Sequence, residues 1–327
     1  MKIDIHTHIM PAQMPNWTKK FGYGEFIHLE HRNCEACMMK ADKVFRVVEE
    51  NCFNEIVRMD EMDAGNVTRQ VLSTIPVLFN YWAKPEHGLE TSRFFNDHIA
   101  EVVSRYPDRF TGIGTVPLQD VDLAVCEMER CIHELHMPGV EIGTNVNGKN
   151  LNEKDFFLFY EAAEKLNCSV FVHPWEMMGE NHMQRYWLPW LVGMPAETSR
   201  AICSLIFGGV MEKFSNLKFA FAHGGGSFPF TIGRIEHGFN VRPDLVAVDN
   251  NINPESYLGK FWVDSLVHDA KALEYLIKIV GDDKICLGSD YPFPLGEHQP
   301  GKLIEELLPG QDTKEKLLYK NALDWLG

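Results

Sequence analysis

The 327-residue sequence is short of positive charge, with 31 lysines and arginines against 46 aspartates and glutamates and a formal net charge of −15. Nucleic-acid binding depends on clustered basic side chains that neutralise phosphates. The sequence has no basic stripe of that kind, so nucleic acid is not an expected partner. An anionic substrate would have to be held by local arginines and a metal ion.

Long apolar runs and a disulfide framework are also missing. No run reaches the ~18 residues that a membrane-spanning helix needs, and no signal peptide precedes the first predicted strand. We therefore expect a cytoplasmic protein without a membrane partner. The eight cysteines are too few for a disulfide scaffold in a chain of this length. Cys34 and Cys37 form a CxxC pair without a second pair at zinc-ribbon spacing, which favours an incidental pair over a redox or structural-zinc role.

Two glycine-rich nucleotide motifs are absent as well. No Gly-x-Gly-x-x-Gly follows the first predicted strand, and no Gly-Lys-Ser/Thr follows the three glycines at 224–226. These glycines either let the backbone approach a substrate closely or form a structural tight turn.

What the sequence does have is a regular alternation of strands and helices. Apolar runs such as 219–222 predict strands that are buried on both faces, as in a parallel sheet. Eight strands, each followed by a helical pattern, are predicted at 2–9, 68–75, 110–116, 139–144, 169–173, 217–223, 261–266 and 284–290. Eight β/α units predict an α/β protein with a closed (β/α)8 TIM barrel, as a single domain over 1–327, and an open doubly wound sheet is the alternative.

The stretch from about residue 10 to 54 interrupts this alternation. It lacks helical periodicity and contains short β-like pieces at 26–30 and 44–48. A loop of this length in a compact domain is usually functional or a small subdomain. We predict a small β-rich insertion that covers one end of the barrel. Within it, Arg46 is either an arginine on a solvated strand face or a clamp for a substrate.

Histidines and a carboxylate mark the carboxyl ends of the predicted strands, where barrel enzymes place their active sites. His6 and His8 end the first strand at i, i+2 spacing, so both imidazoles point to one face. His173, His223 and Asp290 end the fifth, sixth and eighth strands. Each residue alone has an ordinary structural explanation, but together they predict a metal site suited to zinc.

The number of these residues indicates which of them bind the metal. His6, His8, His173 and Asp290 with a water complete one mononuclear site, and His223 is then free to act as a general base near neutral pH. The predicted strand at 139–144 contains no lysine. A carboxylated lysine that bridges two metals is therefore not available there, which favours a single metal.

Five motifs resemble the amidohydrolase superfamily, and more narrowly a family of decarboxylases within it. They are His6-Thr7-His8, His173-Pro174-Trp175 and the stretches 187–197, 222–228 and 287–297. The resemblance covers essentially the whole chain, including the insertion around Arg46. One departure is Glu176, which stands where members of the family often have aspartate.

The resemblance implies a zinc-dependent, non-oxidative decarboxylation of a dicarboxylate semialdehyde in the kynurenine route of tryptophan breakdown. It implies one Zn²⁺ per subunit on the four ligands named above, with His223 as the catalytic acid/base. It also implies that Arg46 and Arg234 hold the substrate carboxylates, with Arg234 reaching the neighbouring site of a homodimer. From the sequence alone, Arg234 is a surface arginine. Further pocket positions implied by the resemblance are Lys40, Met177, Trp190, Phe293 and Leu295.

Three other functions stay open. A mononuclear zinc hydrolase of the same superfamily would attack a lactone or amide and would not need two arginines. A metal-dependent decarboxylase of an aromatic acid is the nearer alternative. A zinc-stabilised binding protein without activity would have a closed metal site and would leave His223 without a role.

Overall fold

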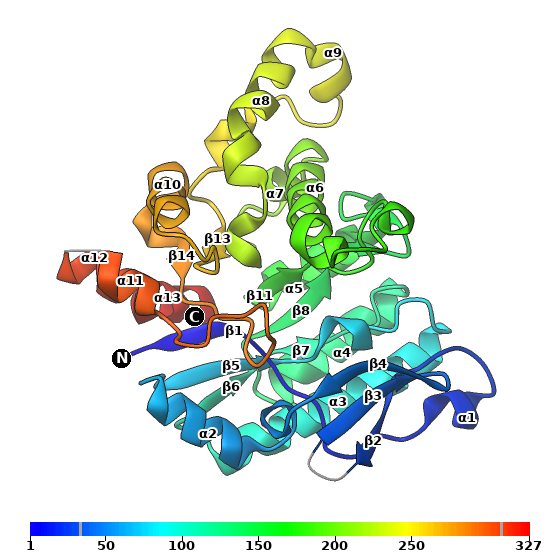
Figure 1. Cartoon of the computed structure of the whole chain (residues 1–327). Helices are drawn as coiled ribbons and strands as arrows, with labels where there is room; N and C mark the ends of the chain where they lie inside the picture. Colours follow the sequence, from blue (N-terminus) through cyan, green and yellow to red (C-terminus); the bar gives the residue numbers. More distant parts are fainter. Residues whose placement is uncertain (33–34, 308–309) are drawn as a thin grey trace.

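A computed structural model of the chain describes residues 1–32, 35–307 and 310–327. Eight strand positions form its centre, and helices surround them (Figure 1). In order around the barrel these strands are β1 (Ile3–His8), β5 (Arg69–Ser73), β6 (Phe110–Gly112) continued by β7 (Gly114–Thr115), β8 (Gly139–Gly143), β11 (Ser169–His173), β12 (Lys218–Phe221), β13 (Trp262–Asp264) and β14 (Ile285–Cys286).

Every neighbouring pair of these strands is parallel, and the ring closes. The third strand is interrupted at Ile113, whose N–H still donates to the Leu72 carbonyl at 2.9 Å. The eighth strand meets the first where the Ile5 N–H donates to the Leu287 carbonyl at 2.9 Å. The predicted (β/α)8 barrel is confirmed, and the open doubly wound alternative is wrong.

Each strand is followed by helical structure on the outside of the barrel. The helices that cover it are α2 (Glu55–Ala64), α3 (Pro85–Arg105), α4 (Val121–His133), α5 (Phe157–Lys165), α6 (Met194–Phe207), α7 (Val210–Lys213), α8 (Phe228–Val241), α10 (Ala270–Val280), α11 (Lys302–Leu307), α12 (Gln311–Glu315) and α13 (Asn321–Leu326). The predicted start at Asp120 is confirmed, because its side chain accepts from the Leu123 N–H at 3.1 Å as an N-cap. No helix among the described residues is long and apolar enough to cross a membrane.

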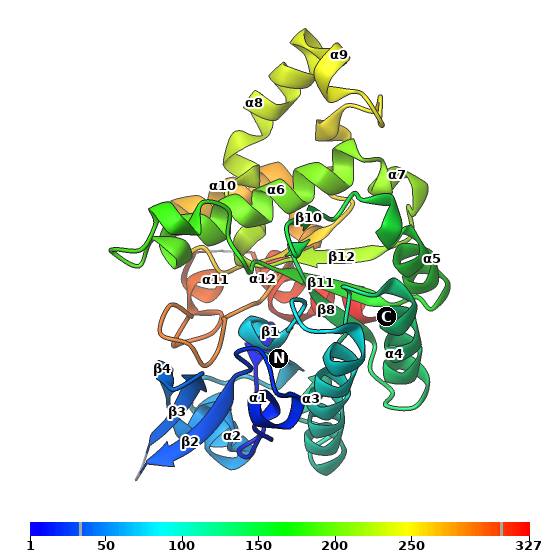
Figure 2. The same ribbon diagram turned by 90° about the vertical axis from the view of Figure 1, so that its right-hand side faces the viewer.

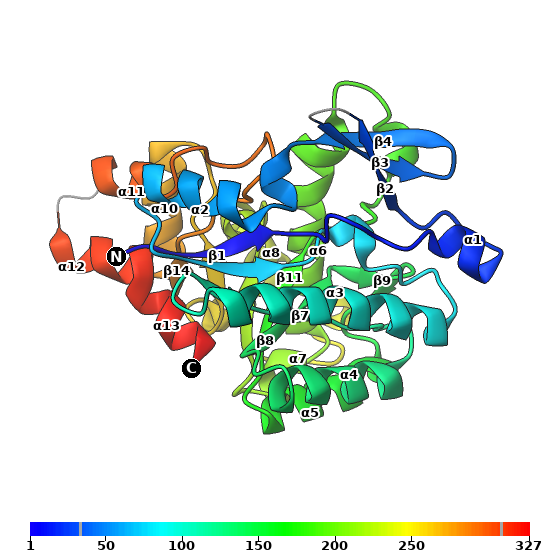
Figure 3. The ribbon, with the colours of Figure 1, turned by 90° about the horizontal axis from the view of Figure 1, so that it is seen from below.

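Apolar side chains fill the barrel and tie the chain ends to it. Ile3, Val71 and Phe171 belong to the cluster inside the strands, together with Trp325 of α13. The Trp325 indole N–H donates to the Lys218 carbonyl at 2.9 Å, which anchors the last helix to the barrel. Both chain ends lie on the same side of the molecule (Figure 3).

The predicted insertion contains a separate antiparallel sheet in the order β2 (His28–Arg32), β3 (Glu35–Lys40) and β4 (Lys43–Val48), preceded by α1 (Trp17–Phe21). The middle strand of this sheet, β3, was not predicted. Its buried Met38 packs into a cluster with Trp17 and with Phe95 of α3. Cys34 of the CxxC pair lies outside the described residues, and Cys37 is buried.

Short elements and shorter strands are the main differences from the prediction. A small hairpin of β9 (Asn145–Val146) and β10 (Lys149–Asn150) and a helix α9 (Pro243–Val246) were not predicted. The eighth strand ends at Cys286 because the next residues turn toward the first strand, where the Ser289 N–H donates to Asp4 Oδ1 at 3.1 Å. The helices α8 and α9 and the β2–β4 sheet lie at opposite ends of the molecule (Figures 1 and 2).

Candidate active site

The four predicted metal ligands meet at the carboxyl end of the barrel. His6 and His8 come from β1, His173 ends β11, and Asp290 follows β14. One ligand atom of each lies within 4.8 Å of the others. Asp290 Oδ1 is 3.2 Å from His8 Nε2 and 3.5 Å from His6 Nε2.

The three histidines are oriented by hydrogen bonds on their other ring nitrogen. His6 Nδ1 lies 2.7 Å from the Asp264 carboxylate, His8 Nδ1 lies 2.8 Å from the Thr74 carbonyl, and His173 Nδ1 lies 3.0 Å from the carbonyl of the next residue. With the proton on Nδ1, each Nε2 carries a lone pair. All three Nε2 atoms are buried and have no hydrogen-bond partner among the described residues. Unsatisfied buried nitrogens that converge on a carboxylate fit a bound divalent cation.

The protonation states agree with that fit. Burial lowers the pKa of the His8 and His173 imidazoles, so both are neutral near pH 7 and keep a lone pair for a cation. Burial alone would raise the pKa of the Asp290 carboxyl, but the neighbouring His223 and His8 imidazoles hold that pKa well below its usual range. A buried carboxylate anion beside neutral imidazoles is stabilised when a cation joins it.

Asp264, at the end of β13, holds two parts of the site together and was not among the predicted residues. Its Oδ2 accepts from His6 Nδ1 and, at 2.8 Å, from the backbone N–H of His223. Its Oδ1 accepts from the N–H groups of Gly224 and Leu266 at 2.8 and 3.1 Å. The sequence signal was available, since a carboxylate at the end of the seventh strand obeys the same strand-end rule as Asp290.

His223 lies beside the ligands without belonging to the set. Its Nε2 is 3.8 Å from Asp290 Oδ2, and its ring centroid is 5.1 Å from that of His6. Burial would lower the pKa of this imidazole, but the nearby Asp290 carboxylate raises it. His223 therefore lies next to the ligand set, and its role as a proton carrier stays a prediction.

The glycines after His223 form a tight turn packed against the first turn of α6. His223 itself has a φ of 57°, and Gly226 has a φ of 64°. A side chain at Gly226 would place its Cβ 2.3 Å from the Pro195 carbonyl oxygen. Of the two interpretations of these glycines, this geometry supports the structural turn.

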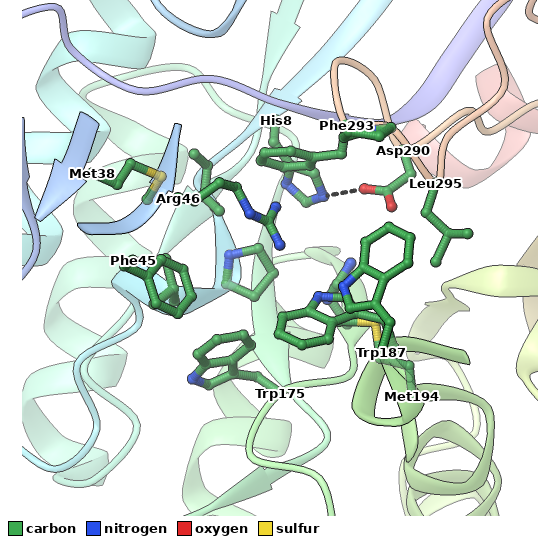
Figure 4. A pocket seen from close by; sticks show the side chains of 16 residues that line it. His8, Met38, Phe45, Arg46, Trp175, Trp187, Met194, Asp290, Phe293 and Leu295 are labelled. Atoms are coloured by element: carbon green, nitrogen blue, oxygen red, sulfur yellow. Dashed lines mark ion pairs between the residues drawn. The ribbon is translucent and has the colours of Figure 1, made fainter. Parts of the chain in front are cut away.

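A cavity opens over the metal ligands and is walled mostly by apolar side chains, among them the rings of Phe45, Trp175, Trp187, Trp190 and Phe293 (Figure 4). Arg46 of β4 points into it, with its guanidinium carbon 4.8 Å from the Phe293 ring centroid and 5.8 Å from that of Trp190. Burial lowers the pKa of this guanidinium. No carboxylate among the described residues forms an ion pair with Arg46, so its charge is available to an anionic ligand.

The remaining predicted pocket residues fall into two groups. Trp190, Phe293 and Leu295 line the cavity, whereas Met177 is buried behind Gly193 and Lys40 is exposed, 3.7 Å from Glu25 Oε2.

Arg234 lies on the exposed surface of α8, and neither of the two cavities next to His223 and Asp290 includes it. The prediction missed part of the wall, namely Met38, Phe45, Trp175, Trp187 and Met194. The cluster of tryptophans in the loop after His173 was the available signal for two of these positions, Trp175 and Trp187.

A family model described as amidohydrolase matches residues 3–327. The chain is 56% identical to 2-amino-3-carboxymuconate-6-semialdehyde decarboxylase of Dictyostelium discoideum, an alignment that covers 100% of this chain and 92% of the relative. It is 40% identical to the enzyme of the same name from Caenorhabditis elegans, with 99% and 94% covered. The chain belongs to this decarboxylase family of the amidohydrolases. It is therefore a decarboxylase, a carbon–carbon lyase, as predicted.

A solved structure of another decarboxylase supports the barrel. The 5-carboxyvanillate decarboxylase of Novosphingobium aromaticivorans, complexed with manganese and a nitrobenzoic acid, superposes with a TM-score of 0.85 at 19% identity, covering 100% of this chain and 96% of that one. At this identity the likeness shows the fold. In this chain, the cluster of His6, His8, His173 and Asp290 is itself the evidence for a metal site.

We expect the decarboxylase variant Asp264→Asn to lose metal affinity by about 10- to 100-fold, because the amide no longer supports His6 as the carboxylate does. Competition with a chelator of known affinity measures this loss independently of turnover. Asp269→Asn is the control, because it replaces an exposed aspartate shortly after β13, at the N-cap of α10. Equal metal affinity in both variants would contradict the role of Asp264.

Proposed function

We propose that this chain converts 2-amino-3-carboxymuconate-6-semialdehyde to 2-aminomuconate-6-semialdehyde and CO₂, with one Zn²⁺ per subunit. The observation that carries the substrate assignment is Arg46, a half-buried cation that forms no ion pair with the described residues and lies in the cavity above the metal ligands. Such a group needs an anionic ligand to offset its desolvation. The family identity supports the same assignment, since a muconate semialdehyde with carboxylates is the substrate in the relatives' names.

Zinc follows from the donor set. Three imidazole nitrogens and one carboxylate oxygen suit zinc, which can expand to five-coordination and take a water beside four protein ligands, whereas manganese favours oxygen donors. His6, His8, His173 and Asp290 would hold the ion. When bound, it supplies a Lewis acid and lowers the pKa of a water in the open position.

The chain's own residues account for orientation and proton movement. Decarboxylation breaks the bond to the departing carboxylate, its electron pair moves into the conjugated chain, and a proton replaces the lost CO₂ on that carbon. His223 Nε2 faces Asp290 at the edge of the ligand set and holds the proton that is moved. Arg46 fixes one substrate carboxylate through charge-assisted hydrogen bonds.

The proposed active unit is a homodimer in which Arg234 holds the second carboxylate of the neighbouring site. Arg234 is exposed on α8, which projects at the opposite end of the molecule from the sheet that carries Arg46 (Figures 1 and 2). Exposed apolar side chains continue along this projection, with Phe230 at 63%, Leu245 at 62% and Val248 at 68% exposure. Apolar patches of this kind mark protein–protein contacts.

The direct test is incubation of the purified zinc enzyme with freshly prepared substrate, following loss of its absorbance and release of CO₂. Stoichiometric CO₂ release supports the proposal. A second candidate, decarboxylation of an aromatic acid, is favoured by the aromatic cavity wall and is tested in parallel with 2,6-dihydroxybenzoate. Turnover of the aromatic acid alone would replace the first proposal with the second. The predicted cytoplasmic location and the role in limiting quinolinate and NAD synthesis belong to the first proposal.

We expect Arg46→Ala to lower kcat/KM by about 100-fold, and Arg46→Lys to lower it by about tenfold, because lysine keeps the charge but not the bidentate fork. Lys43→Ala removes an exposed cation from the same strand and serves as the control. Steady-state kinetics on the three variants measure the effect. Wild-type kinetics in Arg46→Ala would show that this arginine does not bind the substrate.

A further inference from the structure

A segment without regular structure, residues 174–178, forms the cavity wall between His173 and the tryptophan-rich loop. Trp175 lines the cavity, and Met177 packs behind it against Gly193. Glu176 has a φ of 54°, a left-handed conformation that is uncommon for a residue other than glycine. Something outside the segment must therefore hold it in place.

Two buried polar side chains, Asn145 and Glu197, hold this segment through hydrogen bonds to its backbone. Asn145 Nδ2 donates to the carbonyls of Trp175 and Glu176 at 3.0 and 3.3 Å. Glu197 Oε2 accepts from the Met178 N–H at 2.8 Å. The two side chains also bond to each other, Asn145 Nδ2 to Glu197 Oε1 at 3.1 Å. Glu197 is 0% exposed and Asn145 is 3% exposed, so water does not compete for these bonds.

The same turn of α6 is fixed to the turn that carries His223. Glu197 lies two residues after Pro195, whose carbonyl accepts from the Ser227 N–H at 3.1 Å, and Ser199 Oγ lies 2.7 Å from Ser227 Oγ. The first turn of α6 thus contacts the cavity wall on one side and the His223 turn on the other.

We propose that Asn145 and Glu197 are positioning residues that set the distance between the Trp175 wall and His223, and through it the width of the substrate cavity. This proposal rests on the proposed function. A buried group that links two walls of a pocket determines how well substrate fits, although it touches neither substrate nor metal. Removing either side chain is expected to loosen the Trp175 wall both in the free enzyme and in the enzyme with substrate bound.

The chain offers a matched control in Glu127 on α4. Glu127 is also 0% exposed, accepts from an asparagine amide (Asn96 Nδ2, 2.7 Å) and pairs with the arginine three residues later (Arg130, 2.7 Å). Glu197 has the corresponding partners, Asn145 and Arg200. Glu127 lines neither cavity next to the metal ligands. A loss of stability alone should therefore be similar in the two variants.

We expect Glu197→Ala and Asn145→Ala to raise KM about tenfold while kcat changes less than about threefold. The reason is that the wall contributes equally to binding of the substrate and of the transition state. Glu197→Gln keeps an oxygen for the Met178 N–H and should recover most of the loss. Glu127→Ala should leave KM at the wild-type value. Equal KM in Glu197→Ala and Glu127→Ala would overturn the proposal.

Hydrogen exchange gives a readout that does not depend on turnover. The backbone amides of 175–178 should exchange at least about tenfold faster in Glu197→Ala and Asn145→Ala than in Glu127→Ala. Unchanged exchange in both would overturn the proposal even if KM rises. If Glu197→Ala does not fold, Asn145→Ala decides alone. Absence of wild-type turnover would overturn the proposed function. The hydrogen-exchange comparison would still decide whether Asn145 and Glu197 hold residues 175–178 in place.

Discussion

Replacing His223 with asparagine is expected to lower kcat by about 1000-fold while the enzyme keeps its metal, because general acid–base catalysis contributes about 10²- to 10⁴-fold. His223 lies outside the ligand set, and its Nε2 is 3.8 Å from Asp290 Oδ2. Asparagine is chosen over alanine because the residue has a φ of 57°, a conformation that asparagine tolerates. Turnover by substrate absorbance and metal content by elemental analysis measure the two halves of the prediction.

His136→Asn is the matched control for this variant. His136 also has a positive φ, 54°, but it is exposed and lies outside the cavity and the ligand set. Its replacement should change neither kcat nor metal content. Full activity in His223→Asn would exclude the residue as the proton carrier. Loss of metal in His223→Asn would make the residue a ligand instead.

The ligand set could be predicted because its physical rule is local. Residues at the carboxyl ends of parallel barrel strands converge, and a strand can be recognised from a short apolar run. His6, His8, His173 and Asp290 all satisfy that rule, and the structure brings their ligand atoms within 4.8 Å of one another. The rule also applied to Asp264, but the seventh strand was predicted to run to residue 266, so Asp264 fell inside the predicted strand and not at its end.

The cavity wall was harder to predict because long-range packing determines it. Arg46 is in the cavity only because the antiparallel sheet of the insertion folds over the barrel mouth, and the central strand of that sheet was not recognised from its sequence. Asn145 and Glu197 are 52 positions apart in the sequence, and the hydrogen bond between them cannot be predicted from the hydrophobic periodicity of the chain. Lys40, implied by the family resemblance, lies outside the cavity, since the end of its strand faces solvent.

A heterodimer of one Arg234→Ala subunit and one His223→Asn subunit is expected to show about half of wild-type activity, although each homodimer is nearly inactive. If Arg234 serves the neighbouring site, one site of the heterodimer has an intact His223 and an intact partner arginine, and the other has neither. Two different affinity tags on co-expressed subunits allow the heterodimer to be purified, and its kcat per dimer is the measurement.

The matched control combines Arg46→Ala with His223→Asn. Arg46 and His223 contribute to the same subunit's site, as the cavity and the contacts with Asp290 indicate. Each site of that heterodimer therefore keeps one defect, and no recovery is expected. Recovery in the Arg234 pair but not in the Arg46 pair would assign Arg234 to the neighbouring site. If the Arg234 pair is as inactive as the Arg46 pair, the shared site is wrong, and the exposed apolar surface of α8 needs a different occupant.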